Sequence, residues 1–270
     1  MTKKKKIFNG MKLLTLNTWG GRVYEPFLNF VKEQNNKVDI FCFQEIFQSS
    51  ESKFSHEIKT DIYSDVSKIL KDYVGFFAPT FTGYDTEEKV DFDLAFGQAT
   101  FVKKNIELIS EETVFVHGKF DYKPPVVIER IKDGMDLPRN IHCLRIKINS
   151  KELLIGNLHG YWLPDSKHDT KQSIKQMKKV KKIFSAFSGP KILCGDFNLR
   201  PDTKSIRILE EDMKNLIIEY GVTSTRSNLH TRVEKFADYI MVSDGIKVNE
   251  FGVINKDVSD HRPLIIDFSV

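Results

Sequence analysis

Side chains that can bind metals or move protons follow apolar stretches at five places in this chain of 270 residues. The most constrained of them is Gly195-Asp196-Phe197-Asn198, which comes directly after the apolar run 191–194. An extended chain presents Asp196 and Asn198 on the same side, so the pair could orient a water molecule while the carboxylate takes its proton. An Asx turn at a strand end would explain the same pair without any chemistry.

Two further candidates end apolar runs nearer the start of the chain. Glu45 follows a fully apolar run, and a carboxylate there loses hydration unless it is paired or bound to a cation. Mg²⁺ prefers one or two carboxylates together with waters and phosphate oxygens, so Glu45 is predicted as a magnesium ligand rather than a surface glutamate. Asn17, in Leu16-Asn17-Thr18-Trp19, could accept a hydrogen bond from a metal-bound water or donate one to a phosphate oxygen.

Two histidines complete the set of candidates. Strand alternation puts Asn157 and His159 on one face, where either could donate to charge developing on a phosphate. His261 follows Asp260, and Asp238 could orient its imidazole and keep it protonated. Ser259 as the nucleophile of a serine hydrolase is a poor rival, because it is too close to His261 in the chain and no GxSxG elbow is present. This inventory of carboxylates, amides and histidines suits metal-assisted attack of water on a phosphate ester.

The elements that must position these groups follow from hydrophobic periodicity. Period-two or wholly apolar runs predict strands at 13–18, 38–43, 94–102, 106–115, 141–148, 153–158, 191–194, 239–242 and 264–268. Apolar residues at helical spacing predict helices at 25–35, 61–70 and 170–187, the last with a lysine-rich outer face. We expect surface loops at 82–91 and 117–139, a single α/β domain over 11–270, and a flexible basic leader over 1–10.

Composition sets limits on the class of protein. Hydrophobic residues make up 40% and charged residues 29%, which is typical of a soluble globular protein, and the net charge of +4 permits a polyanionic substrate. Three widely spaced cysteines without a zinc-binding pattern predict reduced core thiols and a cytoplasmic protein. No apolar run approaches the ~20 residues needed to span a bilayer. We expect a monomer.

The ordered motifs resemble the endonuclease/exonuclease/phosphatase superfamily. The resemblance runs from about residue 12 to residue 268 and is carried by the sequences LNTW, QE, NLH, GDFN, DYI and SDHRP. It implies a four-layer α/β sandwich, in which two packed mixed β-sheets are flanked by helices and the active site lies at one rim of the sheets.

The resemblance also implies roles for the metal and water site. Glu45 would be the principal ligand of Mg²⁺, for which Mn²⁺ can substitute, and Asn17 would lie in the metal or phosphate shell. Asp196, helped by Asn198, would orient and deprotonate the water. Asp260 would act in the metal shell or position its neighbour.

The phosphate-facing groups are implied in the same way. His261, braced by Asp238, would contact the phosphate and stabilise the pentacovalent state. His159 resembles the leaving-group histidine of the pancreatic-type deoxyribonuclease and sphingomyelinase branches, with Asn157 binding phosphate beside it. Many apurinic-site nucleases carry tyrosine at the His159 position and an acidic residue at that of Trp19, which argues against an abasic-site repair enzyme.

Three functions fit these residues. The first is a nuclease acting on DNA, with the basic stretch 171–182 and Arg226, Arg232 and Arg262 meeting the backbone. Trp19 and Tyr161 would then bind substrate by stacking on bases. The second is hydrolysis of a phospholipid, sphingomyelin, inositol phosphate or small phosphomonoester. Hydrolysis at a membrane surface would need an exposed apolar hairpin, and none is obvious, although 74–81 is apolar and aromatic. The third is an inactive binding module. The number of metals and endonucleolytic or exonucleolytic action stay open.

Overall fold

The computed structural model describes residues 10–85, 87–120, 137–164 and 166–270. The predicted basic leader, apart from Gly10, and most of the predicted loop at 117–139 therefore lie outside the described residues.

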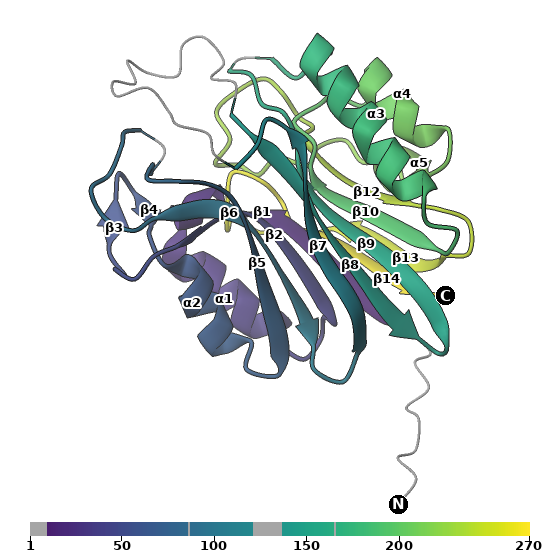
Figure 1. Cartoon of the computed structure of the whole chain (residues 1–270), viewed down its shortest axis with the longest axis horizontal. Coiled ribbons are helices and arrows are strands. Elements are labelled where there is room, and N and C mark those ends of the chain that lie inside the picture. Colours follow the sequence, from purple (N-terminus) through teal and green to yellow (C-terminus); the bar gives the residue numbers. More distant parts are fainter. Residues whose placement is uncertain (1–9, 86, 121–136, 165) are drawn as a thin grey trace, which may run out of the picture.

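Two six-stranded mixed sheets form the centre of the molecule (Figure 1). The first has the order β13-β14-β1-β2-β6-β5, with β1 Met11–Asn17, β2 Ile40–Gln48, β5 Tyr73–Thr82, β6 Ala95–Lys103, β13 Lys247–Val253 and β14 Leu264–Ser269. The second has the order β11-β12-β10-β9-β8-β7, with β7 Glu107–His117, β8 Arg139–Ile148, β9 Lys151–His159, β10 Lys191–Asp196, β11 Lys214–Asn215 and β12 Asp238–Val242. A separate two-stranded hairpin pairs β3 Phe54–Ser55 with β4 Ile58–Lys59.

Helices cover the outer faces of both sheets, which gives the predicted four layers (Figure 1). On the first sheet lie α1 Tyr24–Gln34 and α2 Ile62–Ile69, and on the second lie α3 Lys171–Ser185, α4 Lys204–Glu210 and α5 Leu216–Glu219. A short 3-10 turn, η1 Trp19–Gly21, follows β1. Among the described residues, no helix is long and apolar enough to cross a membrane.

Strand alternation explains why the first sheet is apolar on both faces. Leu13 of β1 belongs to the core cluster shared with the second sheet, whereas its neighbour Leu14 packs in the cluster beneath α1 and α2. The same holds in β2 for Cys42 and Phe43. A sheet buried on both faces reads as a continuous apolar run, which is the pattern that the sequence shows here.

All nine predicted strands and all three predicted helices exist, but several boundaries were wrong. β2 continues to Gln48, so Glu45 lies within the strand rather than after it, and β10 continues through Asp196. The stretch 74–81 is part of strand β5, which pairs with β6, and the sequence did not predict β13, α4 or α5.

Two parallel strand pairs bring the candidate residues to one rim. β1 runs parallel to β2 with Asn17 opposite Gln44, and β9 runs parallel to β10 with His159 opposite Asp196. The antiparallel strand β12 then sets Asp238 opposite Asp196. Because the carboxyl ends of parallel strands meet at the same edge of a sheet, each sheet delivers its polar side chains to the same end of the molecule.

Gly195 is required where β10 approaches β9. Its φ is +131°, and a Cβ there would lie 2.0 Å from the carbonyl oxygen of Leu158. We expect Gly195→Ala to lower the free energy of unfolding by about 3 kcal/mol, because it adds an overlap with backbone to a strained φ. Urea denaturation measures this, with Gly252→Ala as the control, since a Cβ on Gly252 meets nothing within 4 Å. Equal stability of the two variants would contradict the close approach.

Candidate active site

Asp196 lies at the centre of the rim. Its Oδ2 accepts a hydrogen bond from Asn17 Nδ2 at 2.9 Å and lies 3.9 Å from His159 Nε2 and 3.7 Å from His261 Nε2. Its Oδ1 accepts the backbone N–H of Asn198 at 2.8 Å. The last residue of one buried strand thus meets candidates from both sheets.

Glu45 approaches this centre through a β-bulge. The register of β2 against β6 shifts between Phe43 and Ile46, and Glu45 has a φ of +55°, which turns its carboxylate toward the rim. Asn17 Nδ2 donates to Glu45 Oε1 at 2.9 Å as well as to Asp196. The oxygen of Asn17 accepts the backbone N–H of Trp19. As oriented here, Asn17 joins two carboxylates as a donor, and its place in the metal or phosphate shell stays a prediction.

His261 is held by Asp238. Its Nδ1 lies 2.8 and 2.9 Å from the two carboxylate oxygens of Asp238, which leaves Nε2 directed at Asp196. Thr225 donates to Asp238 Oδ2 at 2.8 Å and so fixes the carboxylate in turn. The structure therefore brings together the brace and the imidazole that the sequence predicted.

Burial and neighbouring charges separate the pKa values of these groups. Burial raises the pKa of Asp196, but His261, His159 and the cation Lys167 outweigh this effect and lower it. Burial and Arg226 lower the pKa of His261, but Asp238, Asp260 and Asp196 outweigh them and raise it. The lowered pKa keeps Asp196 ionised at neutral pH, and the neighbouring carboxylates favour the protonated form of His261 relative to that of a free imidazole.

The pKa of the second histidine, His159, is lowered and that of the second carboxylate, Glu45, is raised, opposite to the shifts of His261 and Asp196. Burial, followed by Arg139, lowers the pKa of His159 well below its usual value, so this imidazole is neutral at pH 7. Burial raises the pKa of Glu45, and Asp260 and Asp196 raise it further against the lowering effect of Asn17. Buried carboxylates this close together are most stable with a cation between them.

Asn198 connects the central carboxylate to a buried lysine. It has a φ of +57°, its Nδ2 donates to the carbonyl of Gly160 at 3.3 Å, and its Oδ1 accepts a hydrogen bond from Lys167 Nζ. Burial lowers the pKa of Lys167 to about 8, although Asp196 raises it. Asn198 thus contacts Asp196 through its backbone N–H, while its side chain holds Lys167, and its help in orienting the water stays a prediction.

Asp260 is bound to cations of the protein. Its Oδ2 lies 3.1 Å from Arg226 Nη1 and 3.3 Å from His230 Nδ1, and its pKa falls to about 2, because His261, His230 and Arg226 outweigh burial. Within the described part of the chain, neither potential metal cluster includes Asp260: one is formed by Glu45, His159 and Asp196, and the other by Asp196, Asp238 and His261. This arrangement favours the second of its predicted roles, the positioning of its neighbour.

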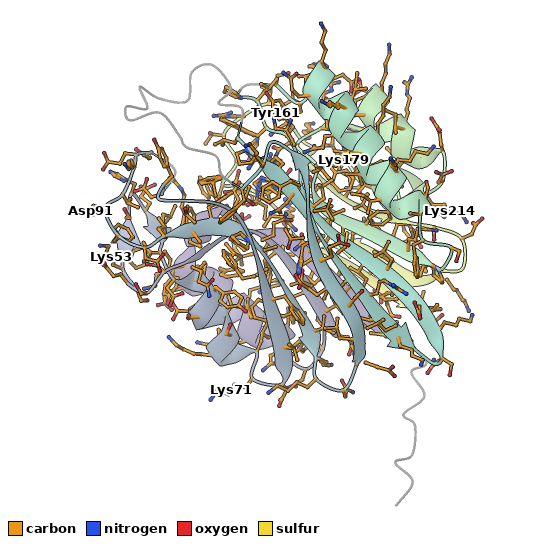
Figure 2. The ribbon with its side chains drawn as sticks, viewed as in Figure 1. Lys53, Lys71, Asp91, Tyr161, Lys179 and Lys214 are labelled. Carbon is orange, nitrogen blue, oxygen red and sulfur yellow. The ribbon has the colours of Figure 1, made fainter. Side chains whose placement is uncertain are left out.

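Two predicted substrate-binding residues do not reach the site. Asn157 is fully buried between the sheets, where its oxygen accepts from Gln44 Nε2 at 2.6 Å and its Nδ2 donates to the carbonyl of Phe43. The phosphate contact predicted for Asn157 is wrong, because both ends of its amide bind protein groups. Tyr161 packs its ring against His117 with centroids 4.8 Å apart, near the end of β9 (Figure 2), and the neighbouring Trp162 lines the cavity instead.

A cavity of about 470 Å³ opens over the rim. Asp196, His261 and Glu45 lie among its lining residues, and Trp19 and Trp162 supply aromatic surface. Trp19 therefore lies at this cavity, and the substrate binding predicted for it stays a prediction. The described residues of the predicted loop at 82–91 contribute no side chain to this cavity.

Sequence reasoning missed part of the charge around the site. Lys167 and His230 line the cavity, and Arg226, predicted only as a backbone contact, reaches His261 itself. Arg139, at the start of β8, is buried and influences the pKa of His159. These residues lie in irregular stretches or at strand starts, so no periodic pattern marks them. The surplus of basic residues was the available signal, and it does not say where they gather.

The residues present fit a divalent cation. Ligand atoms of Glu45, His159 and Asp196 lie within 4.8 Å of one another, and burial together with Asp260 and Asp196 disfavours the charged form of Glu45, which a cation would offset. Carboxylate oxygens suit Mg²⁺ and Mn²⁺, and imidazole suits Mn²⁺ and the later transition metals better than Mg²⁺. Glu45 and Asp196 would hold the ion, with His159 as the third candidate.

The Asp238–His261 pair makes a prediction about pH. Because Asp238 raises the pKa of His261, Asp238→Asn should lower it, so the imidazolium is lost at lower pH. We expect the basic limb of the kcat/KM profile to move toward lower pH. The exposed Asp244, in the turn after β12, provides the control Asp244→Asn. An unshifted basic limb in Asp238→Asn would show that His261 does not act as the acid.

Comparison with known proteins places this geometry in a family. The model of the endonuclease/exonuclease/phosphatase family matches residues 14–261. The chain therefore belongs to the endonuclease/exonuclease/phosphatase family, as its motifs predicted. Members of this class hydrolyse phosphoester bonds. No curated protein matches this chain.

Solved structures share the fold at low sequence identity. A family protein from Leptotrichia buccalis is 20% identical with a TM-score of 0.68, and the match covers 96% of this chain and 100% of that one. The mannosyl-6-phosphatase Bt3783 from Bacteroides thetaiotaomicron is 18% identical with a TM-score of 0.66, covering 96% and 100%. D. rerio TDP2, complexed with single-strand DNA product, is 13% identical with a TM-score of 0.64, covering 97% and 100%. At these identities the likeness establishes the fold alone.

Proposed function

We propose that the chain is a divalent-metal-dependent phosphoesterase in which Asp196 directs water at the phosphorus atom. The observation that carries the proposal is the meeting of Asp196, Glu45 and both histidines within 4 Å contacts at one rim. Mg²⁺ is the expected cofactor and Mn²⁺ its substitute. The cytoplasmic location and the monomeric state stay predictions.

Each residue has a part in the hydrolysis. Asp196 accepts a hydrogen bond from the water and orients it for in-line attack, and because its pKa is lowered, orientation contributes more than proton removal. His261 donates from Nε2 to a phosphate oxygen, while Asp238 holds Nδ1. His159, across Asp196 from His261, faces the leaving group. A bound divalent cation supplies charge that polarises the phosphoryl group.

The first substrate candidate is nucleic acid. Arg226, Arg232 and Trp162 line the cavity and could meet a backbone phosphate and a base. The lysines of α3 support it less, because the helix lies over the outer face of the second sheet, where Figure 2 marks Lys179. TDP2, one of the structural relatives, is complexed with single-strand DNA.

The second candidate is a small phosphomonoester. The density of cations in a cavity of about 470 Å³ favours a compact anionic group, and one structural relative is a mannosyl-6-phosphatase. A phospholipid or sphingomyelin substrate has less support, because the apolar and aromatic stretch 74–81 lies in strand β5, which pairs with β6 in the first sheet.

A substrate panel tests the proposal. Purified protein with Mg²⁺ or Mn²⁺ is offered plasmid DNA, single-stranded DNA, RNA, abasic duplex, sphingomyelin, inositol phosphates and sugar phosphates. Hydrolysis of at least one phosphoester that stops in Asp196→Asn is expected. A chain that binds members of the panel but hydrolyses none would instead be the inactive binding module.

A further inference from the structure

Arg226 and His261 meet in the lining of the cavity. Arg226 Nη1 contacts His261 Nε2, the nitrogen left over when Asp238 binds Nδ1. His261 Nε2 in turn lies 3.7 Å from Asp196 Oδ2, so Arg226 is one side chain away from the central carboxylate. Arg226 is itself buried, with 7% of its surface exposed, and its Nε has no partner among the described residues.

Lys167 is a second buried cation close to Asp196. Lys167 has 6% of its surface exposed, and its Nζ binds Asn198, whose backbone N–H holds Asp196. With a pKa of about 8 it is mostly charged at pH 7. Arg226, Lys167 and His261 therefore line the same cavity as Asp196.

The charge of the cavity indicates which ester fits. Among its described lining residues, Arg22, Lys167, Arg226 and Arg232 are matched by an equal number of carboxylates. A divalent cation would leave the cavity with a surplus of two positive charges, before any charge on His261 is counted. A phosphodiester carries one negative charge and two non-bridging oxygens. A phosphomonoester above its second pKa of about 6 carries two negative charges and three such oxygens.

Resting on the proposed function, we infer that Arg226 and Lys167 make this a site for a terminal phosphate, so that the substrate is a phosphomonoester dianion rather than an internal phosphodiester. Arg226 binds an oxygen that His261 also binds, and Lys167 binds a second. The step is hydrolysis: water forms the new P–O bond, the P–O bond to the alcohol breaks, and the alcohol and inorganic phosphate are released.

A monoester and a diester that share the same leaving group, p-nitrophenol, test this inference. p-Nitrophenyl phosphate and bis-p-nitrophenyl phosphate are compared in wild type, Arg226→Met and Lys167→Met. We expect each substitution to lower kcat/KM for the monoester by about 30- to 100-fold, because one hydrogen bond to a charged oxygen is lost. For the diester we expect a decrease of less than about tenfold. Arg226→Lys should recover part of the monoester rate. Arg207→Met and Lys182→Met, on exposed positions of α4 and α3, are the controls.

A binding measurement separates this inference from the proposed function. Inorganic phosphate is titrated calorimetrically into EDTA-treated and Mg²⁺-loaded protein, with dimethyl phosphate as the monoanionic comparison. We expect phosphate to bind at least about tenfold tighter than dimethyl phosphate, and Arg226→Met and Lys167→Met to remove the difference.

The outcomes are distinct. Metal-dependent hydrolysis of the diester in preference to the monoester, with both esters affected equally by the substitutions, would overturn the inference and leave the proposed function intact. If neither of these esters nor any member of the substrate panel is hydrolysed, the proposed function fails, and phosphate binding decides: loss in both variants supports the dianion site, and unchanged binding overturns it.

Discussion

Asp196→Asn is expected to lower kcat/KM by about 1,000-fold or more while the protein stays folded. The substitution keeps the shape of the side chain but removes the charge that His261, His159 and Asn17 all face. Water then loses its orienting acceptor, and the site loses one of its two carboxylates for a cation. Steady-state kinetics with saturating Mg²⁺ or Mn²⁺ measures the change.

The control for this variant is Asp202→Asn, an exposed carboxylate paired with Arg200 on the loop that follows β10. It should retain wild-type kinetics. Circular dichroism and thermal melting of both variants establish that the fold is intact. Activity in Asp196→Asn within about tenfold of wild type would exclude the central carboxylate from the chemistry.

His261→Ala carries the second large expected effect, a loss of about 100- to 1,000-fold in kcat at nearly unchanged stability. The imidazole donates to the phosphate only as charge develops there, so its removal acts on the transition state more than on the fold. Asp238 keeps its hydrogen bond from Thr225, which limits the cost of the missing partner. Urea denaturation and kinetics are compared on the same preparation.

His168→Ala is the matched control, because His168 is exposed and lies beside Lys167 in the chain. It should change neither rate nor stability. If His261→Ala unfolds, or loses stability in proportion to its loss of rate, then His261 is a structural residue and its role at the phosphate is wrong.

The strands that could be predicted from the sequence are those with a clear local hydrophobic pattern. β1 and β2 are continuous apolar runs because helices cover one face of their sheet and the second sheet covers the other. β13 was missed because it is a largely exposed strand at the sheet edge, without a buried face to give alternation. The β-bulge that turns Glu45 toward the rim is a tertiary feature, because a positive φ at a glutamate has no sequence signature.

The candidate site was predictable where its residues end buried strands, as Asn17, His159 and Asp196 do. The phosphate contact predicted for Asn157 was wrong, because strand alternation shows which face of the sheet a side chain is on but not how deeply it is buried. Asn157 lies two residues before His159, and there the same face points between the two sheets. Lys167 and Arg226 reach the site from irregular segments, so their places depend on long-range packing.

Titration of Mn²⁺ into EDTA-treated protein, with binding and hydrolysis recorded together, tests the metal-dependent chemistry most directly. The account predicts no measurable hydrolysis of p-nitrophenyl phosphate or its bis ester in EDTA, and a rate that rises in step with metal binding. Glu45→Gln should weaken the binding and shift the rate curve to higher metal concentration by about tenfold or more. Full activity in EDTA, or a rate that does not follow occupancy of the site, would contradict the account.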